Sequence, residues 1–180
     1  YGSVIIPTQY TSIYKEGGKY LVENDSLKGI VNAYGSTVIP CKYNTIEYED
    51  GVYYVSAGGK YGIYNTYGST ILPCRYSSIR KEGRQYLVEN NGLQGIVNTY
   101  GSTIIPCRYN KIQQEGNIYY VTANGKKGIF NRYGSTIIPC QYDEIISLGH
   151  RYIVKRDKKF GVYNQYGSTI LPCSFRKSNA

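Results

Sequence analysis

A single 33-residue period runs through the whole chain and limits what it can fold into. The tripeptide Tyr-Gly-Ser begins each copy, and all six prolines and all five cysteines keep one register within it. No copy carries an insertion or a deletion. Such strict repetition predicts one supersecondary unit that stacks on copies of itself. We expect one repeat array over 1–180, made of units 1–33, 34–66, 67–99, 100–132 and 133–165 with a partial unit 166–180.

The residue types within the repeat favour strands over helices. The chain has 23 Tyr, 21 Gly and 6 Pro, frequent Ile and Val, and neither Met nor Trp. Aromatic and β-branched side chains suit a pleated, half-buried surface, while Gly and Pro mark turns. We therefore predict an all-β protein. Its apolar runs fall far short of the ~20 residues of a membrane-spanning helix, so no membrane insertion is expected.

Turn signals divide each unit into four short strands. The first is Asn-x-Tyr-Gly, as in Asn65 to Gly68, where Asn suits the start of a type I turn. The second is a two-residue hairpin loop such as Asn124-Gly125, and a third falls near Glu82-Gly83. Proline after Ile-Ile or Ile-Leu is expected to end the remaining strand, because it cannot donate to a ladder.

The Asn124-Gly125 loop also predicts which residues face each other. If it contains two residues, Val121 pairs with Gly128, Tyr119 with Phe130 and Tyr120 with Ile129. The glycine at this register is expected to leave room for a neighbouring aromatic ring to lie across the strand. Both faces of the hairpin are apolar, so each unit must be covered by its neighbours.

Two architectures satisfy that requirement. The favoured one is an open superhelical or solenoid array of antiparallel β-hairpins, and the alternative is a closed, five-bladed propeller-like ring. Propeller units usually have about 40–50 residues, which makes 33 short for a blade. A weaker period of two units is also present: Tyr20 to Asn24 match Tyr86 to Asn90, whereas Tyr53 to Val55 match Tyr119 to Val121. Neighbouring units are thus expected either to face different surroundings or to descend from a duplicated pair.

The repeat resembles a known family. Lys60-Tyr61-Gly62-Ile63-Tyr64-Asn65, then Gly68, then Ile71-Leu72-Pro73-Cys74-Arg75-Tyr76 is similar to the WG-repeat (KWG) family of bacterial proteins. The resemblance covers the chain but departs at the Trp that names the family, where Lys28, Tyr61, Gln94, Lys127 and Phe160 stand. It implies a β-rich repeat module, often joined to other domains, with no common activity and no catalytic residues to transfer.

No catalytic set or cofactor site emerges from the residue pattern, so we expect a protein that is not an enzyme and takes no cofactor. His150 is the one histidine, and glycine stands at its place in two sister units. Phosphate-binding Gly-rich loops and CxxC pairs are missing from the sequence. The recurring Glu16, Glu49, Glu82 and Glu115 are interpreted as solvated turn residues.

The cysteine row has three interpretations: small buried apolar groups, a reduced thiol row, or disulfides between neighbouring units. It comprises Cys41, Cys74, Cys107, Cys140 and Cys173. The first interpretation is the default, because free Cys is among the most buried residue types. The odd number argues against obligatory pairing and favours a reducing, cytoplasmic compartment, with a surface or secreted location left open.

Two groups of residues are candidates for partner binding. The first is the tyrosine of the Asn-x-Tyr-Gly turn: Tyr34, Tyr67, Tyr100, Tyr133 and Tyr166. These rings either point outward as an anchor row or fold back and cap the neighbouring unit. The second is the basic residues of the C-terminal half, among them Lys126, Lys127, Lys158 and Lys159, which otherwise serve as solubilising charges.

These features favour a binding or scaffold module for a macromolecular partner, and a protein is the expected partner. One alternative is a structural element that self-associates into fibres or stalks through exposed strands. Another is carbohydrate or cell-wall binding through the repeated tyrosines. Nucleic acid is an unlikely partner, although the net charge of +9 keeps the hypothesis open.

Overall fold

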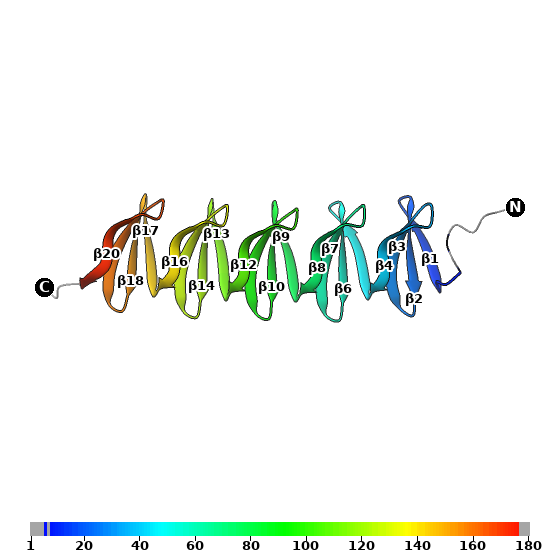
Figure 1. Cartoon of the computed structure of the whole chain (residues 1–180), viewed down its shortest axis with the longest axis horizontal. Coiled ribbons are helices and arrows are strands. Elements are labelled where there is room, and N and C mark those ends of the chain that lie inside the picture. Colours follow the sequence, from blue (N-terminus) through cyan, green and yellow to red (C-terminus); the bar gives the residue numbers. More distant parts are fainter. Residues whose placement is uncertain (1–5, 7, 177–180) are drawn as a thin grey trace. The chain divides into compact units, whose positions relative to one another are not determined.

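The computed structural model describes Ile6 and residues 8–176, and every regular element in that part is a strand. The strands form five four-stranded antiparallel sheets, each an up-and-down meander of sequence neighbours (Figure 1). The first sheet contains β1 (Ser12–Glu16), β2 (Lys19–Asn24), β3 (Leu27–Asn32) and β4 (Thr37–Tyr43). The second contains β5 (Thr45–Glu49), β6 (Val52–Ala57), β7 (Lys60–Asn65) and β8 (Thr70–Tyr76).

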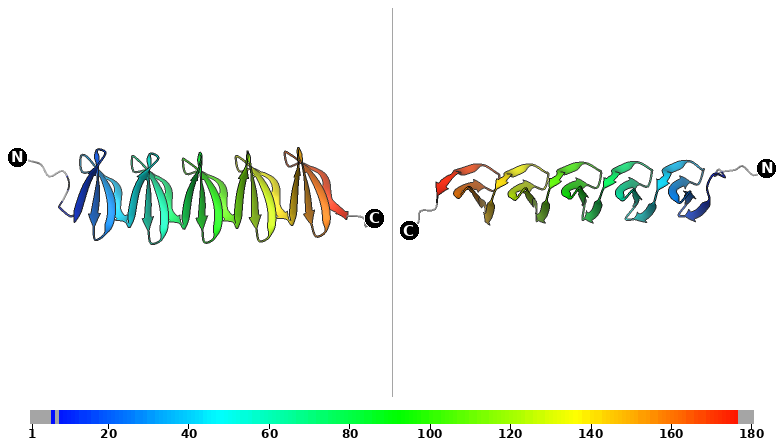
Figure 2. Two further views of the ribbon diagram at one scale, coloured as in Figure 1. Left: turned by 180° about the vertical axis from the view of Figure 1, so that it is seen from behind. Right: turned by 90° about the horizontal axis from the view of Figure 1, so that it is seen from below.

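The remaining sheets repeat this plan, and each is visibly twisted in both further views (Figure 2). The third sheet contains β9 (Ser78–Glu82), β10 (Gln85–Asn90), β11 (Leu93–Asn98) and β12 (Thr103–Tyr109). The fourth contains β13 (Lys111–Glu115), β14 (Ile118–Ala123), β15 (Lys126–Asn131) and β16 (Thr136–Tyr142). The fifth contains β17 (Glu144–Leu148), β18 (Arg151–Arg156), β19 (Lys159–Asn164) and β20 (Thr169–Arg176).

The fold prediction is confirmed at the level of class and repeat. The described strands form no closed barrel, and the successive sheets are consistent with the solenoid-like array that the sequence favours. The chain divides into two compact units, Tyr1–Asn90 with Thr99–Gly101, and Asn91–Asn98 with Ser102–Ala180. The first two sheets, β9 and β10 belong to the first unit, and the last two sheets belong to the second. A single array over 1–180 stays a prediction.

The hairpin register matches the prediction residue for residue. Tyr119 pairs with Phe130, Tyr120 with Ile129 and Val121 with Gly128. Asn124 and Gly125 form the two-residue loop between Ala123 and Lys126, with φ angles of 50° and 75°. Positive φ at both positions is the type I′ geometry whose twist suits a hairpin.

The prediction that proline ends its strand is wrong. Strand β8 continues from Thr70 to Tyr76 through Pro73, and β4, β12, β16 and β20 run through their prolines in the same way. Two features make this compatible with a sheet. β8 is an edge strand, and its pairing with β7 shifts register between Ile63↔Leu72 and Tyr61↔Tyr76. At a bulged edge the missing N–H of proline leaves no ladder bond broken. Pro7 lies outside the described residues.

The bulge also explains why glycine stands opposite it in the neighbouring strand, and the reason differs from the predicted one. A Cβ on Gly62 would lie 2.7 Å from the backbone nitrogen of Cys74 and 2.9 Å from the carbonyl oxygen of Leu72. Glycine is therefore required because the bulged edge strand approaches the backbone closely, and not because an aromatic ring crosses there. The same contact recurs at Gly29, Gly95, Gly128 and Gly161, each against the cysteine twelve residues later.

The core lies between successive sheets. In the first unit, Ile30, Ile39 and Tyr43 of the first sheet pack against Tyr53 and Val55 of the second. In the second unit, one cluster combines Ile129, Ile138 and Tyr142 with Tyr152 and Val154 of the following sheet. Burying a side chain of this size contributes about 1.5–3 kcal/mol, so the stability of each sheet depends on its neighbour.

Candidate functional site: the exposed tyrosine turns

The Asn-x-Tyr-Gly turn is held by a dense set of local hydrogen bonds. The Oδ1 atom of Asn65 accepts from the backbone N–H groups of Tyr67 and Ser69, both at 2.9 Å. The Gly68 N–H donates to the Asn65 carbonyl, and the Asn65 N–H donates to the Ser69 carbonyl. An asparagine side chain that accepts from its own turn fixes the backbone beneath the tyrosine. Turns at Asn32, Asn131 and Asn164 carry the same side-chain bonds.

The glycine of this turn is pressed against the preceding sheet at Gly68, Gly101, Gly134 and Gly167. Gly68 has φ +88°, and a Cβ there would lie 2.2 Å from the carbonyl oxygen of Val38 in β4. Both the backbone conformation and the contact therefore require glycine. Gly101 meets Ile71 in the first unit, and in the second unit Gly134 meets Ile104 and Gly167 meets Ile137. The glycine thus makes the contact between sheets.

Because the glycine makes that contact, the neighbouring tyrosine ring is left in solvent. The fractional exposures are 87% for Tyr34, 89% for Tyr67, 86% for Tyr100, 73% for Tyr133 and 80% for Tyr166. The interpretation that these rings fold back and cap the next unit is wrong. Tyr133 is the least exposed of the five, and the Arg132 guanidinium lies 4.7 Å from its ring centroid. The Tyr1 turn lies outside the described residues.

The predicted lysines lie at the other end of the strands. Lys126 opens β15 and Tyr133 follows the end of the same strand, so six residues, about 20 Å of extended chain, separate the two. Lys127, Lys158 and Lys159 are exposed, whereas Lys126 is half-buried and forms an ion pair with Asp143. Their hydrogen bond raises the pKa of Lys126 and lowers the pKa of Asp143. The lysines and tyrosines therefore do not form one site.

The cysteines of the row are free and half-buried. Each thiol donates to a backbone carbonyl fourteen residues earlier, as from Cys74 to Lys60 at 3.1 Å. Burial raises the pKa of the Cys140 thiol, which disfavours a reactive thiolate. Both the buried-apolar and the reduced-thiol interpretations agree with this placement. The cellular compartment of the protein stays a prediction.

The remaining chemical candidates are dispersed. His150 is exposed, and its Nδ1 lies 2.6 Å from Oε1 of Gln165. Among the described residues, no group of three or more His, Cys, Asp or Glu side chains could hold a metal ion. Nor does any helix in that part have the length and apolarity to cross a bilayer. Tyr53 and Tyr119 lie in the core, 8% and 1% exposed.

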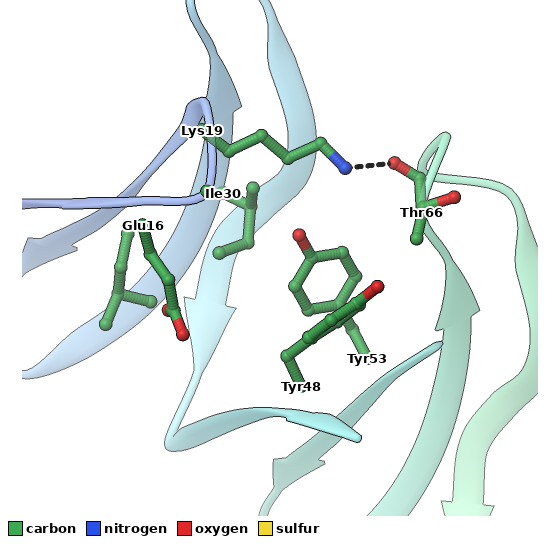
Figure 3. Close-up of a pocket in the computed structure, with 8 residues that line it drawn as sticks. Glu16, Lys19, Ile30, Tyr48, Tyr53 and Thr66 are labelled. Carbon is green, nitrogen blue, oxygen red and sulfur yellow. Dashed lines mark hydrogen bonds between the residues drawn. The ribbon is translucent and has the colours of Figure 1, made fainter. Parts of the chain in front are cut away.

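A cavity of about 400 Å³ is a further feature, and the sequence reasoning missed it. It lies in the first unit, where the β1–β2 turn meets strands β5 and β6 (Figure 3). The Tyr48 and Tyr53 rings line one side with centroids 5.0 Å apart. The Nζ of Lys19 lies 5.3 Å from the Tyr53 centroid and donates to the Thr66 carbonyl. The sequence did contain one signal for this cavity, which is the two-unit period. Leu21 lines the cavity, and the equivalent residue in the next copy is Tyr54.

The repeat geometry agrees with a sequence-family match. The model of the WG containing repeat matches residues 29–61, which is one full period of the chain. Residues 29–61 are assigned as a WG repeat. The WG position before the recurring glycine lies on β7 in the second sheet, where Tyr61 pairs with Tyr76 and is 45% exposed. The match supports a repeat module, as the sequence predicts.

Solved structures similar to this chain are distant. One is a eukaryotic initiation factor, with 10% identity, a TM-score of 0.37, and coverage of 93% of this chain and 54% of that one. Another is the AfRom2 CNH domain, with 10% identity, a TM-score of 0.33, and coverage of 92% and 71%. A third is Hsv2p of Kluyveromyces lactis, with 12% identity, a TM-score of 0.31, and coverage of 87% and 62%.

The chain therefore spans about half of the initiation factor and under two thirds of Hsv2p. TM-scores this low carry no argument about its function. No curated protein is significantly similar to it.

Proposed function

We propose that the chain is a binding module that holds a protein partner on its exposed tyrosine turns. The observation that carries the proposal is the exposure of the five turn tyrosines, from 73% to 89%, at equivalent positions of successive repeats. Tyrosine offers a large rigid surface with one hydroxyl at a low cost in side-chain entropy, and it is enriched among the residues that dominate binding energy.

The turn itself supports this role. An exposed ring on a loose loop would lose backbone freedom on binding, which weakens association. Here the Asn65 side chain and the contact of Gly68 with Val38 already fix the backbone on both sides of Tyr67. The position of the ring is therefore set before a partner arrives.

The exposed lysines supply a second element of the proposal. Lys127, Lys158 and Lys159 lie at the opposite ends of their sheets from the tyrosines. Positive charge away from the contact surface accelerates the approach of an acidic partner more than it strengthens the complex. Self-association and carbohydrate binding stay predictions.

Affinity capture from cells of the source organism tests the proposal. The wild-type chain is compared with a variant in which Tyr34, Tyr67, Tyr100, Tyr133 and Tyr166 are changed to Ser. The matched control changes the exposed serine two residues after each tyrosine to Ala: Ser36, Ser69, Ser102, Ser135 and Ser168. Circular dichroism verifies that all three chains keep their strands.

Each recovered protein is then purified, and its affinity for the three chains is measured by calorimetry. We expect the tyrosine variant to bind at least about tenfold more weakly, the effect of losing one strong anchor, and the serine control to bind like wild type. Equal affinities for all three chains would show that the tyrosine turns are not the binding surface.

A further inference from the structure

The cavity beside Tyr48 and Tyr53 lies at a position of the repeat where the size of the side chain alternates. Leu21 lines it from β2, and the equivalent residue in the next sheet is Tyr54. The Tyr54 hydroxyl interacts with that of Tyr86, which occupies the position of Tyr53 in the following copy. All five residues belong to the first unit. At the second of these interfaces, a tyrosine of the chain reaches across a gap that Leu21 leaves open at the first.

The second unit repeats the filled arrangement. Tyr120 stands at the same register as Tyr54 and packs on the core cluster that contains Tyr152. At both interfaces a side chain of the preceding sheet, Tyr54 or Tyr120, meets an aromatic residue of the following sheet. In both cases that side chain is a phenol. The chain itself therefore indicates the shape and chemistry that complete the Leu21 interface.

The lining residues of the open interface suit the same group. Ile30 is 3% exposed and, with Leu21, gives an apolar floor, while the Tyr48 and Tyr53 rings stand beside it. The Tyr53 phenol corresponds to Tyr86, the residue whose hydroxyl interacts with Tyr54. Glu16 and Lys19 add one carboxylate and one ammonium at the rim (Figure 3). A neutral hydroxyl that both donates and accepts satisfies these partners better than a purely apolar ring.

We propose that this cavity binds a hydroxyl-bearing aromatic ring, with Leu21 and Ile30 beneath the ring and the Tyr53 hydroxyl as its hydrogen-bond partner. The ring is supplied either by a small phenol or by a tyrosine side chain of another polypeptide. Of the exposed tyrosine turns only Thr66 lines the site, and none of the five turn tyrosines does. The cavity can therefore fail as a binding site while the proposed partner surface holds, and the reverse.

Methyl NMR on the full chain tests the site with p-cresol, the side chain of tyrosine, as the probe. We expect the methyl signals of Leu21 and Ile30 to shift saturably. Toluene, which has the same ring without the hydroxyl, is expected to bind about fivefold more weakly, which corresponds to one neutral hydrogen bond. In the Tyr53→Phe variant, that preference for p-cresol over toluene should disappear.

The decisive variant is Leu21→Tyr, which places in the first sheet the residue that Tyr54 and Tyr120 already supply elsewhere. It should fold, keep or raise the thermal unfolding temperature, and abolish p-cresol binding. Tyr34→Ser, on an exposed turn outside the cavity, should bind p-cresol like wild type. N-acetyltyrosinamide separates the two sources: saturable binding identifies a peptide tyrosine, and binding of p-cresol alone identifies a small phenol. Absence of saturable shifts in wild type, undiminished binding to Leu21→Tyr, or toluene bound as tightly as p-cresol would overturn the proposal.

Discussion

The hydroxyl oxygens of Tyr43 and Tyr64 lie 2.7 Å apart and join the edge strand of the first sheet to the second sheet. Their rings meet edge to face, with centroids 5.9 Å apart and planes at 68°. Tyr109 and Phe130, the equivalent pair two repeats later, keep nearly the same arrangement at 5.7 Å and 68°. The ring contact therefore does not need the hydroxyl bond, and the two contributions are separable.

The Tyr64→Phe variant is expected to lower the free energy of unfolding by about 1 kcal/mol, the net contribution of one neutral hydrogen bond. Urea denaturation followed by circular dichroism measures this change. Tyr64→Ala is the comparison, and it should cost about 3 kcal/mol because it removes the ring contact as well. If the two variants lost equal stability, the ring packing would contribute nothing, contrary to the geometry of Tyr109 and Phe130.

High pH should destabilise the fold through its buried tyrosines. Burial and a hydrogen bond to Tyr163 raise the pKa of Tyr142 to about 12. Burial and a hydrogen bond to Tyr64 likewise raise the pKa of Tyr43 above its ordinary value. A pKa that is higher in the folded state means that the folded chain holds its proton more tightly. The stabilisation is complete below pH 10, the ordinary tyrosine value, and is lost as the pH rises toward 12.

Unfolding free energies measured between pH 8 and pH 12 check this expectation. Each such tyrosine should contribute a decline of at most about 1.4 kcal/mol per pH unit above pH 10. In Tyr142→Phe the decline should be shallower, whereas removal of the exposed phenol in Tyr67→Phe should leave it unchanged. A stability that stays level to pH 12 would mean that these phenols ionise as freely in the fold as in the unfolded chain.

Two glycines of one hairpin should respond differently to alanine. Gly62 lies in β7, where a Cβ would be 2.7 Å from the Cys74 backbone, so Gly62→Ala is expected to cost at least about 3 kcal/mol. Gly59 has φ +71° in the β6–β7 turn with nothing within 4 Å, so Gly59→Ala should cost only about 1–2 kcal/mol of backbone strain. Thermal unfolding ranks the two variants, and the opposite order would contradict the close approach of the bulged strand.

The side chain of Asn65 should matter to the turn that presents Tyr67. Asn65→Ala removes the acceptor of two backbone N–H groups and is expected to cost about 1 kcal/mol. Hydrogen exchange at the Tyr67 and Ser69 amides should accelerate in this variant, because both lose their partner. Ser69→Ala leaves the same backbone bonds in place and serves as the control. Unchanged exchange in Asn65→Ala would show that the turn is fixed by its backbone alone.

The sequence alone determined the repeat, the strand count and the hairpin register. The pairing of Tyr119 with Phe130 followed from Asn124-Gly125, because the type I′ loop leaves a two-residue hairpin only one register. It also identified the turn tyrosines as candidates, although their exposure depends on what lies next to each turn. The path of β8 through Pro73 was missed, because the rule that proline ends a strand holds only where its N–H would have faced a partner.

Tertiary structure decided the features that depend on a neighbouring sheet. The fixed 33-residue spacing places Gly68 in the chain, but only the packing of sheets brings it against the Val38 carbonyl and leaves the Tyr67 ring in solvent. Likewise, the alternation of Leu21 with Tyr54 is visible in the sequence, and the cavity it opens is not. Local pairing is set by turn geometry over a few residues, whereas burial and cavities depend on the sizes of side chains that meet from different repeats.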